Sequence, residues 1–148
     1  MIKVAVSACL LGENCKYNGL NNYNLDVNKL KDKIEIIPIC PEVFGGLPTP
    51  RTPSEIRGAK VYYKTGENVT KYFKEGAKNA LEVLLKNDVK IAILKDGSPS
   101  CGRSYIYDGS FTGKTKPGSG VTAKLFLENG IKIYSEKEIE KFKKEVLG

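Results

Sequence analysis

The chain has 148 residues, of which 41% are hydrophobic and 28% charged, so it can bury the core of one domain and is not a disordered tail. The absence of histidine excludes Ser-His-Asp and Cys-His catalysis, histidine-ligated zinc or haem, and a histidine general base. The net charge is +7, which lysines spread over a protein surface commonly produce without a specific role. A more specific interpretation is that the protein attracts phosphate or nucleic acid.

Apolar runs rich in Val and Ile alternate along the chain with segments of helical periodicity. Ser135 followed by Glu138 has the pattern of a capping box and predicts the start of the last helix. The short run Val61–Tyr63 is ambiguous. In chain order we expect a strand at Ile2–Ser7, a short helix at Leu25–Lys33, a strand at Ile34–Ile39, a helix at Thr70–Lys86, a strand at Val89–Leu94, a helix at Val121–Glu128, a strand at Ile131–Tyr134 and a last helix that carries Ile139 and Phe142.

This alternation of continuous apolar strands and helices predicts an α/β fold, with a mostly parallel sheet covered by helices on both faces. We expect a Rossmann-like three-layer arrangement and one domain that spans residues 1–148. The alternative is an α+β fold in which Tyr62-Tyr63 and Tyr105–Tyr107 form a hairpin-like excursion. No signal peptide and no apolar stretch of membrane-spanning length is recognised, so we expect a cytoplasmic protein without a membrane partner.

The four cysteines lie in turn-rich loops beside strand ends. Cys9, Cys40 and Cys101 each follow a predicted strand, and Cys15 lies just before Asn18-Gly19, a turn signal. If the strands are parallel, the first three thiols leave the sheet at the same carboxyl edge, where open α/β sheets form their ligand sites. Cytosolic cysteines are more often ligands or reactive thiols than disulfides.

Three interpretations of the cysteines compete. They are small buried hydrophobic residues, or a zinc site made of all four, or ligands of an iron–sulfur cluster. A structural zinc site usually has ligand pairs two to four residues apart, and this sequence has no such pair. Three thiolates on a 4Fe-4S cube leave one iron open to substrate, which is a catalytic arrangement.

Each cysteine also belongs to a distinctive block of sequence. These blocks are Val6–Gly12, Cys15–Gly19, Cys40–Arg51 and Leu94–Gly102, and a further pattern covers Gly113–Gly118 and Gly120–Ala123. In this order they resemble the signature blocks of the 2-thiouracil desulfurase family. The departures are mild: Lys16 stands where the family usually has Arg, and Asn18 where it usually has Asp.

The resemblance implies a 4Fe-4S cluster with three cysteine ligands and removal of sulfur from thiolated uracil compounds. By block, it implies Cys9, Cys40 and Cys101 as the ligands. Cys15 is then a neighbouring thiol that handles sulfur, or a ligand in place of Cys40. An open iron would polarise the C=S group and accept its sulfur while water attacks the carbon.

The same blocks suggest roles for other residues. Glu42 is the expected base for water, and its alternative is a loop carboxylate paired with Arg51. Ser98 and Ser100 are expected to orient the substrate. The alternative for both serines, and for Asp96, is that they cap turns of the loop. We assign substrate binding to Arg51, Lys95 and Asp96, and a substrate phosphate would favour Arg51, Lys95 or the helix start at Gly120–Thr122.

The expected partner is a thiolated nucleobase, nucleoside or nucleotide, and the sequence leaves open a tRNA-derived substrate. A different class of function also remains: a non-catalytic metal- or nucleotide-binding module with a structural cysteine site.

Overall fold

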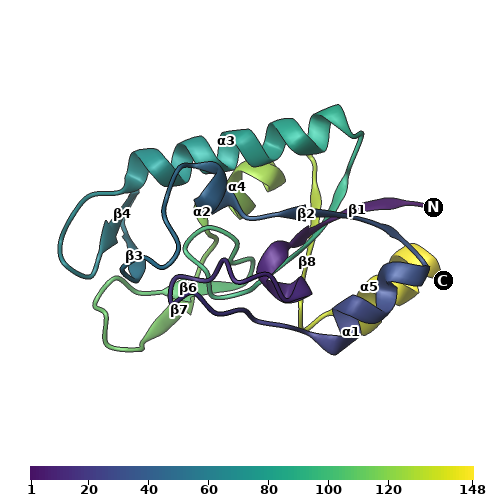
Figure 1. Cartoon of the computed structure of the whole chain (residues 1–148), viewed down its shortest axis with the longest axis horizontal. Helices are drawn as coiled ribbons and strands as arrows, with labels where there is room; N and C mark the ends of the chain where they lie inside the picture. The colour runs from purple at the N-terminus through teal and green to yellow at the C-terminus, as the bar shows by residue number, and fades with distance from the viewer.

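Four parallel strands form the centre of the computed structural model, which describes residues 1–148 (Figure 1). They lie in the order β2-β1-β5-β8. Pro38 lies in β2, which is an edge strand. A proline is tolerated there because its missing N–H can face the side on which no further strand pairs. The strands are β1 (Lys3–Ser7), β2 (Glu35–Ile39), β5 (Ile91–Leu94) and β8 (Lys132–Ser135).

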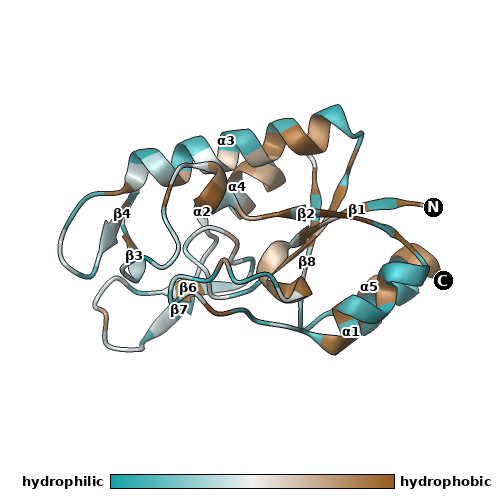
Figure 2. Ribbon diagram, in the orientation of Figure 1, coloured by the Kyte–Doolittle hydropathy of each residue, from teal (hydrophilic) through white to brown (hydrophobic).

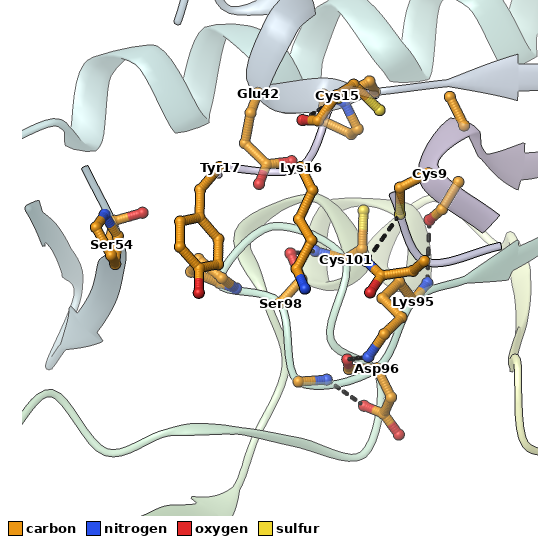
Figure 3. Close-up of a pocket in the computed structure, with 18 of the residues that line it drawn as sticks. Cys9, Cys15, Lys16, Tyr17, Glu42, Ser54, Lys95, Asp96, Ser98 and Cys101 are labelled. Carbon is orange, nitrogen blue, oxygen red and sulfur yellow. Dashed lines mark hydrogen bonds between the residues drawn. The ribbon is translucent and has the colours of Figure 1, made fainter. Parts of the chain in front are cut away.

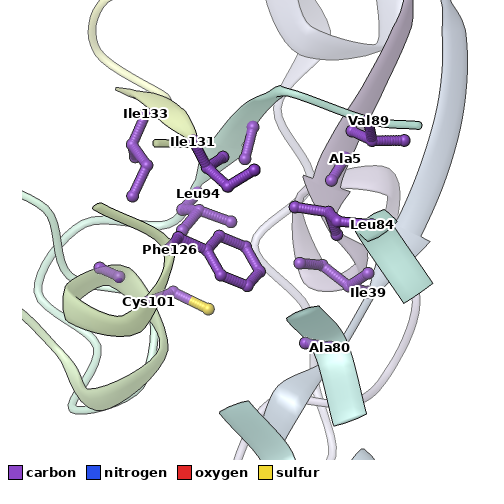
Figure 4. Packing of buried hydrophobic residues seen from close by; sticks show 12 residues of the cluster. Ala5, Ile39, Ala80, Leu84, Val89, Leu94, Cys101, Phe126, Ile131 and Ile133 are labelled. Carbon is purple, nitrogen blue, oxygen red and sulfur yellow. The ribbon is translucent and has the colours of Figure 1, made fainter. Parts of the chain in front are cut away.

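Helices cover both faces of this sheet, as the sequence predicts, and each face has its own hydrophobic cluster. One cluster includes Leu84, Leu94 and Phe126 and lies under the helices α3 (Thr70–Lys86) and α4 (Val121–Glu128) (Figure 4). The other includes Leu30, Ile93 and Phe142 and lies under α1 (Leu25–Asn28) and α5 (Ile139–Phe142). The apolar strands of Figure 2 are therefore buried on both sides, which confirms the three-layer α/β prediction.

Two antiparallel hairpins extend beyond the carboxyl ends of the parallel strands (Figure 1). The first pairs β3 (Ser54–Arg57) with β4 (Lys60–Tyr63), and the second pairs β6 (Tyr105–Tyr107) with β7 (Thr115–Pro117). Tyr62-Tyr63 and Tyr105–Tyr107, suggested as a hairpin-like excursion in the alternative fold, lie in these two hairpins, where they pair with β3 and β7 and not with each other. The hairpins are joined instead by Glu55, whose carboxylate accepts the amides of Gly109 and Phe111.

The remaining differences are local. The segment expected as one helix at Leu25–Lys33 is α1 followed by a 3₁₀ turn, Lys29–Asp32. The capping-box contact exists, because the Glu138 carboxylate accepts the Ser135 amide at 2.9 Å, yet α5 begins only at Ile139. No helix is both long and apolar enough to cross a bilayer. The structure also contains two elements that the sequence did not predict, namely α2 (Pro41–Phe44) and a π-helical turn at Lys143–Leu147.

Candidate functional site

All four cysteines line one cavity of about 340 Å³ (Figure 3). Cys9 lies in the 3₁₀ turn after β1, Cys40 directly follows β2, and Cys101 lies in the loop after β5. Because β2, β1 and β5 are adjacent and parallel, these three residues leave the sheet at the same edge. Cys15 comes to the cavity from the loop that follows the 3₁₀ turn Ala8–Leu11.

The thiols differ in their surroundings. Cys101 is 4% exposed and also packs in the cluster under α3 and α4, whereas the other three cysteines are half-buried. Burial raises the pKa of Cys101, and the nearby charge of Glu42 raises it further. Burial also raises the pKa of Cys9, and a hydrogen bond from Asn22 Nδ2 to its sulfur, at 3.5 Å, opposes this effect.

Cys15 and Cys40 act on each other. A hydrogen bond between the two side chains raises the pKa of Cys15 and lowers that of Cys40. The Cys40 thiol also donates to the carbonyl of Cys15 at 3.9 Å, so the two residues are linked through backbone as well as side chain.

Glu42 enters the cavity from α2, which lies against α3 (Figure 3). The two helices approach at Gly45 and Gly76, where a Cβ on Gly76 would collide with the Pro41 carbonyl. A side chain at either position would push α2 away, so the glycines fix where Cys40 and Glu42 stand.

Arg51 holds this part of the wall together. Its side chain is 4% exposed, and its guanidinium lies 3.3 Å from the Glu42 carboxylate. It also donates to the carbonyl of Cys15 at 3.1 Å and to that of Pro48 at 3.3 Å. Burial raises the pKa of Glu42, and Arg51 opposes the rise. The ion pair between Glu42 and Arg51, which the sequence offered as the alternative role for Glu42, is therefore present. The Arg51 guanidinium, which was predicted to bind substrate, already has partners within the protein.

The loop that carries Cys101 is organised by Asp96. The Asp96 carboxylate accepts the amides of Gly97, Arg103 and Ser104 at 3.0–3.1 Å. Burial raises the pKa of Asp96, but amides led by that of Ser104 lower it more, so the net shift is downward. Asp96 is only 3% exposed although it lines the cavity, and its visible role is to shape the loop.

The two predicted serines lie in different places. Ser98 lines the cavity, and its oxygen accepts the amides of Ser100 and Cys101, both at 3.0 Å. Ser100 is fully buried, does not line the cavity, and shares a 2.8 Å hydrogen bond with Thr122. Ser100 therefore lies behind the cavity wall, and its hydroxyl holds α4 to the loop, which corresponds to the loop-capping alternative.

The start of α4 is also occupied. The amides of Thr122 and Ala123 donate to the carbonyl of Ser100, and the Val121 amide donates to that of Pro99. These are the donors that a phosphate at Gly120–Thr122 would need, and they are already used within the protein. Lys95 does line the cavity, and its ammonium lies 3.3 Å from Glu136.

Soft metals prefer sulfur ligands, and all four cysteines line this one cavity. No three or more Cys, Asp or Glu side chains are grouped to hold a single ion, so as placed they do not form the four-cysteine zinc site. In a cluster each thiolate binds a different iron, so the sulfurs need not converge on one point as they would around a single ion.

Several cavity residues were not predicted as functional. Lys16 and Tyr17 line it from the loop after Cys15, and Glu55 and Tyr107 line it from the two hairpins. The only sequence signal for Lys16 and Tyr17 is their place in the same block as Cys15. The hairpin residues have no such signal, because nothing local shows that a hairpin returns to the sheet edge.

A model of the 2-thiouracil desulfurase family matches residues 4–138. The chain belongs to this family. Among curated proteins, the uncharacterized protein YbbK of Bacillus subtilis (strain 168) is 40% identical over 146 residues, which cover 92% of this chain and 97% of YbbK. Among solved structures, the [4Fe-4S]-dependent thiouracil desulfidase TudS is 40% identical, with a TM-score of 0.90 over 95% of each chain. The 2-thiouracil desulfurase family thus accounts for nearly the whole chain, and the fold of this member matches that of TudS.

Proposed function

We propose that this protein removes sulfur from thiolated uracil compounds, using a 4Fe-4S cluster held by Cys9, Cys40 and Cys101. The observation that carries the proposal is the arrival of these three thiols at one cavity from three adjacent parallel strands. Membership of the desulfurase family and the likeness to the [4Fe-4S]-dependent TudS support it.

The reaction is a hydrolysis: the C=S group and water give C=O and hydrogen sulfide, with no net transfer of electrons. Held by the thiolates of Cys9, Cys40 and Cys101, the cluster would supply a Lewis acid for the thiocarbonyl group and an acceptor for its sulfur. The protein must then orient the substrate, bring water to the carbon and accept a proton from that water.

Glu42 is the proton acceptor in this proposal. Its carboxylate lies on the cavity wall, and its raised pKa brings it closer to the range useful for proton transfer near neutral pH. Arg51 keeps the carboxylate in place through the 3.3 Å ion pair. Water held by Glu42 would lose one proton to the carboxylate as it attacks. As the C–S bond breaks and the C=O bond forms, the proton on Glu42 and the remaining hydroxyl proton would both pass to the departing sulfur, which leaves as hydrogen sulfide.

Ser98 and Lys95 orient the substrate. The Ser98 oxygen accepts two amides, and its hydroxyl hydrogen is still available to a uracil oxygen. The Lys95 ammonium is fixed by Glu136 and by the carbonyl of Asp96, which leaves a further N–H for a ligand. Asp96 and Arg51 contribute by holding the loops in place.

The test is anaerobic reconstitution with iron and sulfide, followed by incubation with 2-thiouracil, 4-thiouridine and 4-thiouridine monophosphate. We expect a brown protein that releases sulfide from at least one of them. Cys40→Ser should lose the iron while Cys15→Ser retains it. If Cys40→Ser retains all its iron, the ligand assignment is wrong.

Glu42→Gln separates binding from chemistry, because it keeps the shape and removes the proton acceptor. The iron content should be unchanged, and sulfide release should fall about 100-fold or more. Undiminished release would rule out the role of Glu42. A colourless protein that keeps zinc and releases no sulfide from any compound would instead support the non-catalytic module.

A further inference from the structure

Cys15 is the one cysteine to which the proposed function gives no role. It lines the cavity from the loop after the 3₁₀ turn Ala8–Leu11, and its side chain is half-buried. The thiol of Cys40, also half-buried, shares a hydrogen bond with the thiol of Cys15, and its sulfur lies 3.9 Å from the Cys15 carbonyl oxygen. Two free thiols from distant parts of the chain are therefore in contact on the wall of an open cavity.

The other two thiols have different neighbours. Cys101 is 4% exposed and packs in the cluster under α3 and α4. Cys9 packs against the cluster under α1 and α5. The thiol of Cys101 is hydrogen-bonded to Ser7 and that of Cys9 to Asn22, and neither to another cysteine. Cys15 and Cys40 are therefore the pair placed to bond to each other.

Closing this contact into a covalent bond requires a small movement, since a disulfide holds its two sulfurs about 2 Å apart. Cys40 is fixed between β2 and α2, and the close contact of α2 with α3 keeps that helix in place. Cys15 lies outside the helices and strands, in a loop that can supply the movement. Arg51 donates to the Cys15 carbonyl at 3.1 Å, so it keeps this residue beside Cys40 while the side chain turns.

We propose that Cys15 and Cys40 form a reversible disulfide in the cluster-free protein, which a peroxide closes and a small-molecule thiol reopens. Hydrogen peroxide oxidises one thiol to a sulfenic acid and leaves one water, and the second thiol displaces another water as the S–S bond forms. The two cysteines together lose two electrons and two protons, and the peroxide takes up both as it becomes two waters. Two molecules of a small thiol reverse the step by exchange and become a disulfide themselves.

The bond would control when the cluster is loaded, and this consequence rests on the proposed function, in which Cys40 is a ligand. A sulfur in a disulfide cannot serve as a thiolate ligand, so the oxidised protein must be reduced before it takes up a cluster. The bond also protects Cys40, because a sulfenic acid without a neighbouring thiol is oxidised further to a sulfinic acid, which thiols do not reduce. Cys15 thus preserves the site while the cluster is absent.

The experiment treats the reduced, metal-free protein with hydrogen peroxide, alkylates the remaining thiols and maps the fragments by mass spectrometry. Trypsin alone leaves Cys9 and Cys15 on one peptide, so a glutamyl endopeptidase is added to cut after Glu13. We expect residues 14–16 linked to residues 36–42, and dithiothreitol should free both thiols. When iron and sulfide are then added without a thiol, the cluster should form about 5-fold or more slowly in the oxidised than in the reduced protein.

Two variants serve as controls. Cys9→Ser should form the same disulfide, whereas Cys15→Ser should form none. In Cys15→Ser the fragment 36–42 should gain two oxygen atoms about 5-fold or more faster than in the wild type, because no thiol intercepts the sulfenic acid of Cys40. This rate concerns a single side chain and is read in wild type and variant alike.

Absence of the link, a link from Cys40 to Cys9, or equal rates of Cys40 overoxidation in wild type and Cys15→Ser would overturn the disulfide. Equal rates of cluster formation in the oxidised and reduced proteins would overturn its control of loading. Failure of the proposed function looks different: the link forms and opens as described, yet the reconstituted protein releases no sulfide from any thiolated compound.

Discussion

Arg51→Met tests whether a buried ion pair holds the cavity wall. The substitution removes the partner of Glu42 and the donors to the carbonyls of Cys15 and Pro48, while the methionine preserves much of the volume. Both side chains are shielded, at 4% and 14% exposure. Breaking such a pair from one side costs about 3–5 kcal/mol, which is a large share of the 5–15 kcal/mol that stabilises an ordinary domain.

The assay is urea denaturation of the reduced, metal-free protein at pH 7, followed by circular dichroism. Glu42→Gln supplies the second arm of a double-mutant cycle. In that background Arg51→Met should cost at least about 2 kcal/mol less, because no buried charge is left without a partner. A cost below about 1 kcal/mol in the wild-type background, or the same cost in both, would refute the reasoning.

The pH dependence gives an independent check. Burial raises the pKa of Glu42 in the folded state, and loss of Arg51 removes an interaction that lowers it. The folded variant then binds more protons than the unfolded chain between the unfolded pKa of about 4.3 and the raised folded value. Its stability therefore falls as the pH rises through that window, so the cost of Arg51→Met should be smaller at pH 5 than at pH 7.

Three further predictions concern the supports of the site. Gly76→Ala should lower the stability by about 1–3 kcal/mol or more, as measured by urea, because the added Cβ meets the carbonyl of Pro41. Asp96→Asn should cost about 1–2 kcal/mol at pH 7, and the difference from wild type should shrink as the pH falls below about 3.9, where the depressed pKa of Asp96 ceases to favour the fold. Phe126→Ala should cost about 3–5 kcal/mol in thermal or urea unfolding, whereas Leu127→Ala, with its side chain 49% exposed, should change the stability by less than about 0.5 kcal/mol.

The parallel sheet and its main helices could be predicted from the sequence because their signals are local. Thr70–Lys86 and Val121–Glu128 have the predicted bounds, since apolar periodicity and the Asn129-Gly130 stop act within each segment. The hairpins could not be placed this way. Their strands are short, and Glu55 joins them across more than fifty residues of sequence through backbone amides that carry no residue-specific signal.

The candidate site was predictable in part for the same reason. The position of Cys9, Cys40 and Cys101 after strands is enough to bring them to one edge once the strands are parallel. The difference between Ser98 and Ser100 is not visible in sequence, because it depends on which side of one turn faces α4.

The contact between α4 and the Cys101 loop also has an electrostatic consequence. The first amides of α4 end on the carbonyls of Pro99 and Ser100, so the positive end of this helix abuts the peptide segment that leads into Cys101. A helix terminus of this kind carries a partial positive charge, which favours an anion nearby. Desolvation alone would disfavour a thiolate at Cys101. Because the amides at this end of α4 are already satisfied by carbonyls, they hold the Cys101 loop against the helix and donate nothing to the sulfur.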